Sequence, residues 1–177
     1  YPENEVVNLL ATPNAGYVFS GWTGHTDCAD GSVTMDADKS CTASFTELPK
    51  YTLTVNTTGS GSVTLSPIGG TYYKDTTVRL TATPGPCYVF SSWTGDDADD
   101  LTDNGDGTWS ITMDANKSVT ANFAALPQYA LIAGDDGHGS VTLNPEGGTY
   151  CTGTTVTLTP VPDAGYFFVS WSGTDSS

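Results

Sequence analysis

One aromatic phrase occurs three times in the chain, and it restricts the fold more than any other feature. The copies begin at Tyr17, Tyr88 and Tyr166, and each has a tryptophan five residues later and a glycine two residues after that tryptophan. The aromatic side chains of each copy fall on both faces of an extended segment, which is typical of a buried strand. Because the phrase recurs, the sequence predicts a tandem array of similar units.

The spacing of the tryptophans sets the length of the unit. Trp22 and Trp93 are 71 residues apart, and Trp93 and Trp171 are 78 residues apart. We therefore expect one complete repeat over residues 50–127, preceded by the C-terminal part of a repeat over residues 1–49 and followed by the N-terminal part of another over residues 128–177. On this interpretation the chain begins inside one repeat and stops inside another.

Six short strands are predicted in the complete repeat, because apolar and polar residues alternate in six short runs. A tight hairpin at Asp114–Lys117 is expected to join the last two strands. The flanking copies reproduce four of these strands each, and no run has the period of an amphipathic helix. The expected fold class is therefore all-β. The runs are Tyr51, Leu53 and Val55; Val63 and Leu65; Val78, Leu80 and Ala82; Tyr88 to Trp93; Trp109, Ile111 and Met113; and Val119, Ala121 and Phe123.

The connections between repeats are short and contain proline. Residues 46–50 and 124–128 each carry a Leu-Pro pair, at Leu48 and Leu126. Such a connection does not behave as a flexible Gly/Ser tether. We therefore expect neighbouring repeats to dock in a fixed orientation and to form a rod.

The charge of the chain excludes some classes of partner. Twenty acidic and five basic residues give a net charge of −15, which repels nucleic acid and anionic lipid surfaces. No apolar run approaches the roughly 18 residues that a membrane-spanning helix needs, so no membrane insertion is predicted. Few charged residues together with many threonines, serines and glycines suit an exposed extracellular β surface.

Four cysteines allow three disulfide connectivities. Cys28 and Cys41 fall in one repeat, and we favour a bond between them. Cys87 and Cys151 fall in different repeats, and a bond between them would fix the angle between two neighbouring units. No Cys-x-x-Cys spacing occurs, which argues against a zinc site.

The tryptophans admit two interpretations. Exposed indole faces would suit stacking against sugars, whereas residues that recur at one position of every repeat are usually core. We interpret Trp22, Trp93 and Trp171 as core aromatic residues. Trp109 has no aromatic counterpart in the first repeat, where Gly31 or Ser32 takes its place.

An acidic loop over residues 96–106 is the one candidate metal site. Asp99, Asp103 and Asp106 offer the hard oxygen ligands that Ca²⁺ prefers, although the loop does not fit an EF-hand frame. The competing interpretation, which we favour, is a solvated acidic turn. No other cofactor is expected. Lys39 and Lys117 recur in the predicted hairpins and are expected to be exposed.

Seven short motifs recur in order and resemble the divergent internalin-type B-repeat of bacterial surface proteins. The resemblance implies a small β-grasp-like unit, strung in arrays on secreted or surface-attached proteins and without catalytic residues. The motifs are Tyr-x-Leu-x-Val from Tyr51, Gly-Ser-Val-Thr from Gly61, Gly-Gly-Thr-Tyr from Gly69, Thr-Val-x-Leu-Thr-Ala-x-Pro from Thr77, Tyr-x-Phe-x-x-Trp from Tyr88, Ile-Thr-Met-Asp-Ala-x-Lys-Ser from Ile111 and Thr-Ala-x-Phe from Thr120.

These observations predict a non-enzymatic extracellular or cell-surface protein that acts as a stalk, an adhesin shaft or a filament segment. His25 and His138 lie in Gly/Asp-rich turns without a nucleophile beside them in sequence. Expected partners are neighbouring repeats or further copies of the chain, with glycans or host and cell-surface proteins as additional candidates. The alternative is an array of carbohydrate-binding modules attached to a secreted glycan-degrading enzyme.

Overall fold

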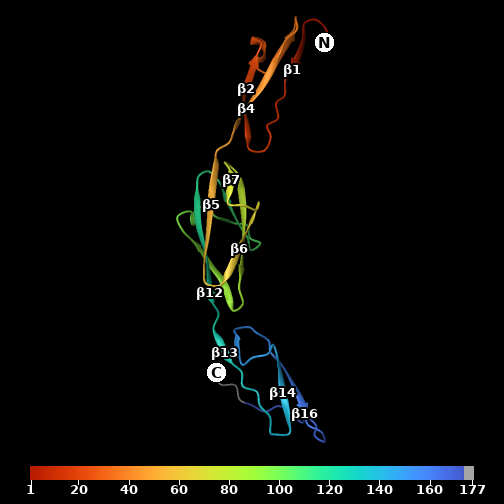
Figure 1. Ribbon diagram of the computed structural model, residues 1–177, viewed down its shortest axis with the longest axis vertical. Helices are drawn as coiled ribbons and strands as arrows, with labels where there is room; N and C mark the ends of the chain where they lie inside the picture. The colour runs from red at the N-terminus through yellow and green to blue at the C-terminus, as the bar shows by residue number, and fades with distance from the viewer. Residues whose placement is uncertain (174–177) are drawn as a thin grey trace.

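The computed structural model describes residues 1–173 and is built from β-strands. Figure 1 shows three successive units along the longest axis, and every described strand pairs only with strands of its own unit. The predicted all-β tandem architecture is confirmed. The predicted third repeat extends to residue 177, so its last four residues lie outside the described part.

The middle unit consists of two four-stranded sheets. One sheet is antiparallel and has the order β10-β11-β8-β6. The other has the order β7-β5-β12-β9, in which β5 and β12 run parallel. The strands are β5 (Lys50–Thr58), β6 (Gly61–Ser66), β7 (Thr71–Tyr73), β8 (Thr77–Pro84), β9 (Tyr88–Thr94), β10 (Thr102–Asp103), β11 (Trp109–Thr112) and β12 (Lys117–Ala125), with a short 3₁₀ helix, η2 (Ala98–Asp100), after β9.

The core of this unit lies between the two sheets. Alternation along each strand turns one face inward, so that β8 buries Val78 and Leu80 while Thr77 and Arg79 stay exposed. Complete burial of a Val, Leu or Ile side chain contributes about 1.5–3 kcal/mol. The buried cluster is Leu53, Tyr72, Val78, Leu80, Ile111, Met113 and Val119.

Two strands of the middle unit were not predicted. β7 has three residues and β10 has two, and both lie at the edge of a sheet. Tyr72 of β7 is buried, and its hydroxyl donates a hydrogen bond to the carbonyl oxygen of Pro67 at 2.9 Å. Runs this short carry too few residues for an alternation pattern, so only pairing reveals them.

The predicted hairpin between β11 and β12 is wrong. β11 pairs with β8, whereas β12 pairs with β5 and β9, so the turn after Thr112 crosses from one sheet to the other. The side chain of Asn116 holds this crossing in place, since its Oδ1 accepts a hydrogen bond from the backbone N–H of Thr52 at 2.9 Å. Two strands that follow each other in sequence are therefore separated by the core.

The first unit repeats the second half of this fold. Its strands are β1 (Glu5–Asn8), β2 (Tyr17–Gly24), β3 (Ser32–Met35) and β4 (Cys41–Glu47), with a 3₁₀ helix, η1 (Thr26–Cys28). β1 pairs with β3, and β2 pairs with β4. These strands correspond to β8, β9, β11 and β12, so the crossing between sheets occurs here too.

The third unit repeats the first half of the fold. Its strands are β13 (Gln128–Ala130), β14 (Gly139–Asn144), β15 (Thr149–Cys151) and β16 (Thr157–Pro162), which correspond to β5, β6, β7 and β8. The strand predicted from Tyr166 to Trp171 is not formed. In the middle unit its counterpart β9 pairs only with β12, and among residues 1–173 no strand takes that place beside the third copy.

Candidate functional site at the joints between repeats

Each pair of neighbouring units is joined by a Leu-Pro dipeptide. Leu48 and Pro49 connect β4 to β5, and Leu126 and Pro127 connect β12 to β13. Both leucines are half-buried, and both prolines are exposed. Proline fixes one backbone dihedral of each linker, so little conformational freedom remains between the units.

The backbone of each linker is hydrogen-bonded to both of the units that it connects. At the first joint, the N–H of Leu48 donates to the carbonyl oxygen of Gly16 at 2.8 Å, and the carbonyl oxygen of Pro49 accepts from the N–H of Lys74 at 2.7 Å. Gly16 belongs to the preceding unit and Lys74 to the following one. The linker therefore clamps the two units in one relative position.

The second joint repeats the same pair of hydrogen bonds. The N–H of Leu126 donates to Cys87 at 2.8 Å, and the carbonyl oxygen of Pro127 accepts from Thr152 at 2.8 Å. Each such bond contributes a net stabilisation of about 0.5–1.5 kcal/mol. The two joints are thus equivalent in backbone geometry, although their sequences differ.

Side chains distinguish the two joints at one pair of positions. At the first joint, Gly16 faces the ring of Tyr73 so closely that a Cβ atom on the glycine would lie 2.3 Å from a ring carbon. At the second joint, Cys87 takes the place of Gly16 and Cys151 takes the place of Tyr73. The structure contains the bond between these two cysteines, with their Cα atoms 5.5 Å apart. One joint is closed by an aromatic contact and the other by a covalent bond.

All residues at this position adopt the left-handed backbone conformation. The φ angles are +82° at Gly16, +63° at Cys87 and +89° at Gly165. Glycine adopts this conformation readily, whereas another residue costs of order 1–3 kcal/mol there. Cys87 occupies it nevertheless, and its side chain forms the disulfide bond with Cys151.

At the first joint, an ion pair and a cation–π contact add to the backbone hydrogen bonds. Lys50 lies 3.0 Å from the Glu47 carboxylate and 4.6 Å from the centre of the Tyr73 ring. The hydrogen bond from Lys50 lowers the pKa of Glu47, and the same bond raises the pKa of Lys50. Both groups are about half exposed, so solvent screens the pair and its contribution is small.

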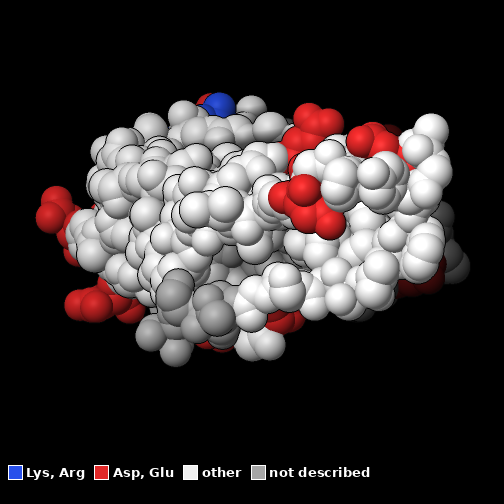
Figure 2. Space-filling model, turned by 90° about the horizontal axis from the view of Figure 1, so that it is seen from below, with Lys and Arg blue, Asp and Glu red and all other residues white. Residues whose placement is uncertain are grey.

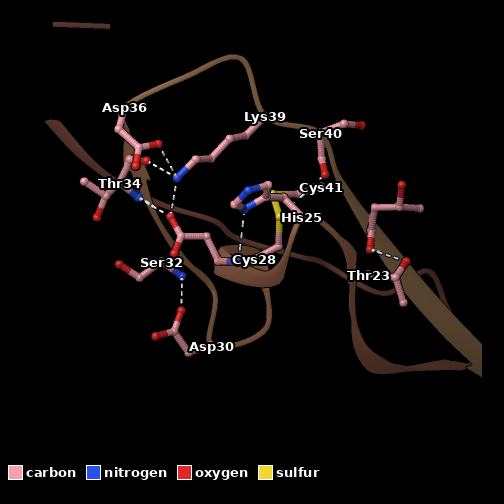
Figure 3. The surroundings of a disulfide bond; sticks show 12 residues. Thr23, His25, Cys28, Asp30, Ser32, Thr34, Asp36, Lys39, Ser40 and Cys41 are labelled. Carbon is pink, nitrogen blue, oxygen red and sulfur yellow. Dashed lines mark hydrogen bonds and ion pairs between the residues drawn. A yellow bond between two sulfur atoms is a disulfide. The ribbon is translucent and has the colours of Figure 1, made fainter. Parts of the chain in front are cut away.

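The first unit contains the other predicted disulfide. Cys28 of η1 and Cys41 of β4 are bonded, with their Cα atoms 5.7 Å apart (Figure 3). Cys28 is fully buried. The bond ties the loop after β2 to the strand that carries the linker, and it therefore supports the first joint from one side.

A buried lysine lies beside this disulfide, contrary to the prediction of an exposed turn. The Lys39 side chain is only 4% exposed, and its Nζ lies 2.5 Å from Asp27 and 2.8 Å from Asp36 (Figure 3). The Nζ also donates to the carbonyl oxygen of Thr34 at 2.5 Å. Hydrogen bonds from Lys39 lower the pKa of both carboxyls, and those carboxylates raise the pKa of Lys39.

Lys117 occupies the equivalent position in the middle unit. Its side chain is 9% exposed, and its Nζ lies 2.5 Å from Asp100, 2.7 Å from Asp114 and 3.8 Å from Asp97. The prediction of an exposed lysine is therefore wrong for both copies. A buried ammonium group is stable only when it is paired, and in each unit the carboxylates come from the loop after the aromatic phrase and from the turn between sheets.

The carboxylates of the acidic loop pair with Lys117 or accept hydrogen bonds from backbone N–H groups, and they do not gather into a metal site. Asp97 accepts a hydrogen bond from the N–H of Ser118 at 2.6 Å, and Asp103 accepts from the N–H of Gly105 at 2.8 Å. Asp106 pairs with Arg79. No cluster of three or more metal-ligating side chains exists among the described residues, and Asp99, Asp103 and Asp106 do not converge as the Ca²⁺ hypothesis requires.

The three recurring tryptophans lie in different surroundings. Trp93 packs against the buried core of the middle unit, 5.6 Å from Phe90 and 5.6 Å from Trp109 between ring centres. Trp22 is half-buried beside Phe19. Trp171 is 49% exposed, which differs from the predicted core position, because no described strand covers its segment as β12 covers β9.

The two histidines take part in local structure. The Nδ1 atom of His25 accepts a hydrogen bond from the N–H of Asp27 at 3.2 Å and so caps η1. His138 stacks on Tyr166 with ring centres 4.3 Å apart.

Sequence reasoning identified the linkers and the cysteines but not the equivalence of the joints. A signal was present, because alignment of the repeats places Cys87 on Gly16 and Cys151 on Tyr73. The sequence also contained a weaker sign that Lys39 and Lys117 are paired and buried, because an aspartate lies three residues before each lysine.

Comparison with known protein families identifies one match. The profile of the divergent InlB B-repeat domain matches residues 1–49, 51–127 and 129–177. No individual curated protein and no solved structure matches the chain significantly. Among the described residues, no helix is both long and apolar enough to cross a lipid bilayer.

Proposed function

The chain belongs to the divergent InlB B-repeat family, and from this membership we propose that it is a non-enzymatic spacer in an extracellular bacterial surface protein. Its task is to hold whatever it connects at a set distance and in a set direction. The observation that carries the proposal is the equivalence of the two joints, in which a Leu-Pro linker is hydrogen-bonded to the unit on either side.

Three features support a stiff spacer rather than beads on a flexible thread. The linkers are too short to let the units tumble independently. The second joint is closed by a disulfide and the first by the contact between Gly16 and Tyr73. A rod with rigid joints keeps its two ends at one distance, whereas a flexible linker of the same length explores many end-to-end distances.

The disulfides support a location outside the cytoplasm. All four cysteines are bonded, and disulfides persist in oxidising compartments. The sparse positive charge, with no Lys or Arg in residues 128–177, suits an exposed surface that does not bind nucleic acid.

The carbohydrate-binding alternative rests on the aromatic residues. It requires exposed indole faces, and Trp93 does not offer one, because its ring lies between Phe90, Trp109 and the core. Quenching of tryptophan fluorescence by a panel of polysaccharides tests this alternative directly. A saturable change would support a glycan-binding role over the spacer role.

Small-angle X-ray scattering at low protein concentration and low salt tests the spacer function. We expect the wild-type chain to scatter as a rod, with the same maximum dimension before and after mild reduction, because the linker hydrogen bonds remain. Replacing Leu126 and Pro127 with glycine under reducing conditions should give a broader and shorter distribution of distances. A wild-type chain as flexible as this variant would overturn the proposal, and Thr46→Ala on β4 serves as the control.

A further inference from the structure

The middle unit is attached to its two linkers at opposite ends of two neighbouring strands. β5 begins at Lys50, directly after the first linker, and β12 ends at Ala125, directly before the second linker. The two strands lie side by side and run parallel. Figure 1 shows β5 leading away from the first joint and β12 ending at the second. We propose that this strand pair is a shear clamp, by which the unit carries tension along the rod.

Tension on the rod pulls β5 and β12 in opposite directions. The proposal rests on the proposed spacer function, because a spacer between two attached partners is pulled at both ends. The first linker pulls the start of β5 towards the first unit, and the second linker pulls the end of β12 towards the third unit. Because the strands are parallel, these forces slide one strand along the other and do not peel them apart.

Six residue pairs form the ladder that resists this sliding. Lys117 lies opposite Leu53 at one end, and Asn122 lies opposite Thr58 at the other. The backbone hydrogen bonds of a parallel ladder run across the strands, so a force along the strands loads all of them at once. Peeling would break the same bonds one after another. Under tension, the ladder therefore yields only when several bonds break together.

Sliding would also pull buried side chains out of the core. On β12, Val119 and Ala121 are fully buried, and Phe123 is 5% exposed. The Phe123 ring packs against Gly61 at the start of β6, where a Cβ atom on the glycine would lie 2.5 Å from the ring. A slip of one residue would turn these side chains to the other face of the sheet. The core and the ladder thus resist the same motion.

An asparagine side chain fastens each end of the ladder. Near the first joint, Oδ1 of Asn116 accepts a hydrogen bond from the N–H of Thr52 at 2.9 Å. At the other end, the hydroxyl of Thr58 donates to Oδ1 of Asn122 at 2.7 Å. Both bonds link β5 to β12 or to the residue before it, so sliding stretches both of them.

Asn122 also connects β12 to its other neighbour. Its Nδ2 donates a hydrogen bond to the Thr94 hydroxyl of β9 at 2.9 Å. β9 runs antiparallel to β12, and Tyr88 at its start lies opposite Ala125. When tension leaves the unit through Ala125 alone, β9 moves together with β12, and the ladder between them is not sheared. Of the two side-chain contacts of Asn122, only the one with Thr58 crosses the clamp.

The disulfide at the second joint determines how far the unit extends after the clamp breaks. Cys87 lies directly before β9 and is bonded to Cys151 of the third unit. In the oxidised chain, residues 88–150 lie inside the loop that this bond closes, and tension does not stretch them. Rupture of the middle unit then frees residues 50–87. After reduction it frees residues 50–125, and tension leaves the unit through Ala125 alone.

Charge keeps neighbouring chains apart, so each rod carries its own load. The net charge is −15, and the view in Figure 2 shows acidic side chains around the outline with very little positive charge. Like charges on two chains repel within the screening distance, which is about 8 Å at physiological salt. Lateral bundling, which would share the load between chains, is therefore disfavoured.

Single-molecule stretching of the full chain, by handles at its two ends, tests the proposal. At about 3.3–3.6 Å per freed residue, less the folded length, the middle unit should lengthen in one step by roughly 100 Å when oxidised and roughly 230 Å when reduced. The longer step identifies the middle unit, because neither flanking unit has enough residues to produce it. A reduced chain that lengthens only in smaller pieces overturns the proposal.

Two variants at the contacts of Asn122 test the direction of the load. Thr58→Val removes the bond across the clamp, and Thr94→Val removes the bond to β9. In the reduced chain at constant force, Thr58→Val should shorten the lifetime of the unit about two- to tenfold, the factor that corresponds to one net hydrogen bond. Thr94→Val should leave the lifetime unchanged, because its bond is still intact in the other variants when the clamp breaks. Equal lifetimes for the two variants overturn the proposal.

A change in the point of attachment tests the geometry without altering the clamp. Ser60 follows β5, at the same end of the strand pair as Ala125. The native cysteines are all bonded, so Ser60→Cys offers one free thiol to which a handle is attached as a thioether before reduction. Pulling between this handle and the C-terminal one should peel β5 from β12 and shorten the lifetime about tenfold or more, because the bonds break singly.

The same labelled chain, pulled by its two end handles, is the control and should behave as the wild-type chain. A lifetime that does not depend on the point of attachment overturns the proposal.

Failure of the clamp and failure of the spacer are separate results. A chain that scatters as a rod, but in which Thr58→Val and Thr94→Val have equal lifetimes under force, is a spacer without a clamp. A chain that is flexible in scattering, yet shows the expected difference between these variants, has the clamp without the fixed joints.

Discussion

Lys117 combines a recurrent sequence position with an unusual environment. Its ammonium group is almost fully buried, yet the carboxylates that surround it are more exposed, from 22% to 64%. The desolvation of one cation is thus offset by several anions that keep contact with water. Asp97 and Asp100 come from the loop after β9, and Asp114 comes from the turn between the sheets. The lysine therefore joins two parts of the unit that share no backbone hydrogen-bond ladder.

Lys117→Met tests this role. Methionine preserves most of the apolar stem but leaves Asp100 and Asp114 without their cation, so repulsion between carboxylates replaces attraction. We expect the thermal midpoint to fall by about 5 °C or more. Lys74→Met is the control, since Lys74 is exposed. Equal midpoints for the two variants would show that the buried lysine contributes no more than a surface lysine.

Acid should weaken the fold through the same residues. Hydrogen bonds from Lys39 and Lys117 lower the pKa of Asp27, Asp36 and Asp114 in the folded chain. Their contribution to the free energy of unfolding is fully present above the ordinary aspartate pKa of about 3.9, and it is lost as the pH falls through the lower folded values.

Denaturant unfolding between about pH 5 and about pH 2 measures this loss. Lys117→Met should show a smaller decrease than the wild-type chain, because the pKa of Asp114 is no longer lowered in that variant. An unchanged pH profile would contradict this assignment.

At the scale of elements, the joint between two units is the arrangement that the chain repeats. The Leu-Pro linker, its two backbone hydrogen bonds and a residue in the left-handed conformation recur at both joints, whereas the side chains at two positions differ. The backbone arrangement is therefore independent of the disulfide. It follows that a disulfide can be moved from one joint to the other.

Gly16→Cys combined with Tyr73→Cys should form a disulfide spontaneously. Cys87 shows that cysteine accepts the positive φ that Gly16 adopts, and removal of the Tyr73 ring makes room for its Cβ atom. Intact-mass measurement with and without reductant, followed by peptide mapping, should show a bond between residues 16 and 73. Gly16→Cys alone is the control and should be destabilised, since its Cβ atom meets the tyrosine ring. A reduced double variant under oxidising conditions would show that the joints differ in geometry.

At the scale of the whole molecule, the middle unit differs from its neighbours in completeness. It has both four-stranded sheets and the largest buried cluster, whereas each flanking unit contains only two-stranded sheets among the described residues. Small two-stranded pieces are marginal without a further layer. Each flanking unit is therefore held by its joint and, in the first unit, by the Cys28–Cys41 bond. Among the described residues, the middle unit therefore has the most extensive sheets and the largest buried core.

The sequence by itself determined the period of the array, the all-β class, the six longer strands of the middle unit and the linkers, and it favoured the pairing of Cys28 with Cys41. These features are local or repeat along the chain, and alternation reveals that a strand has one buried face. Only the tertiary structure decided which strands are neighbours, because alternation carries no information about the partner. It placed β11 and β12 in different sheets, buried Lys39 and Lys117, and left Trp171 exposed. Each of these outcomes depends on groups distant in sequence: carboxylates that gather around an ammonium group, or a strand that is required to cover a ring.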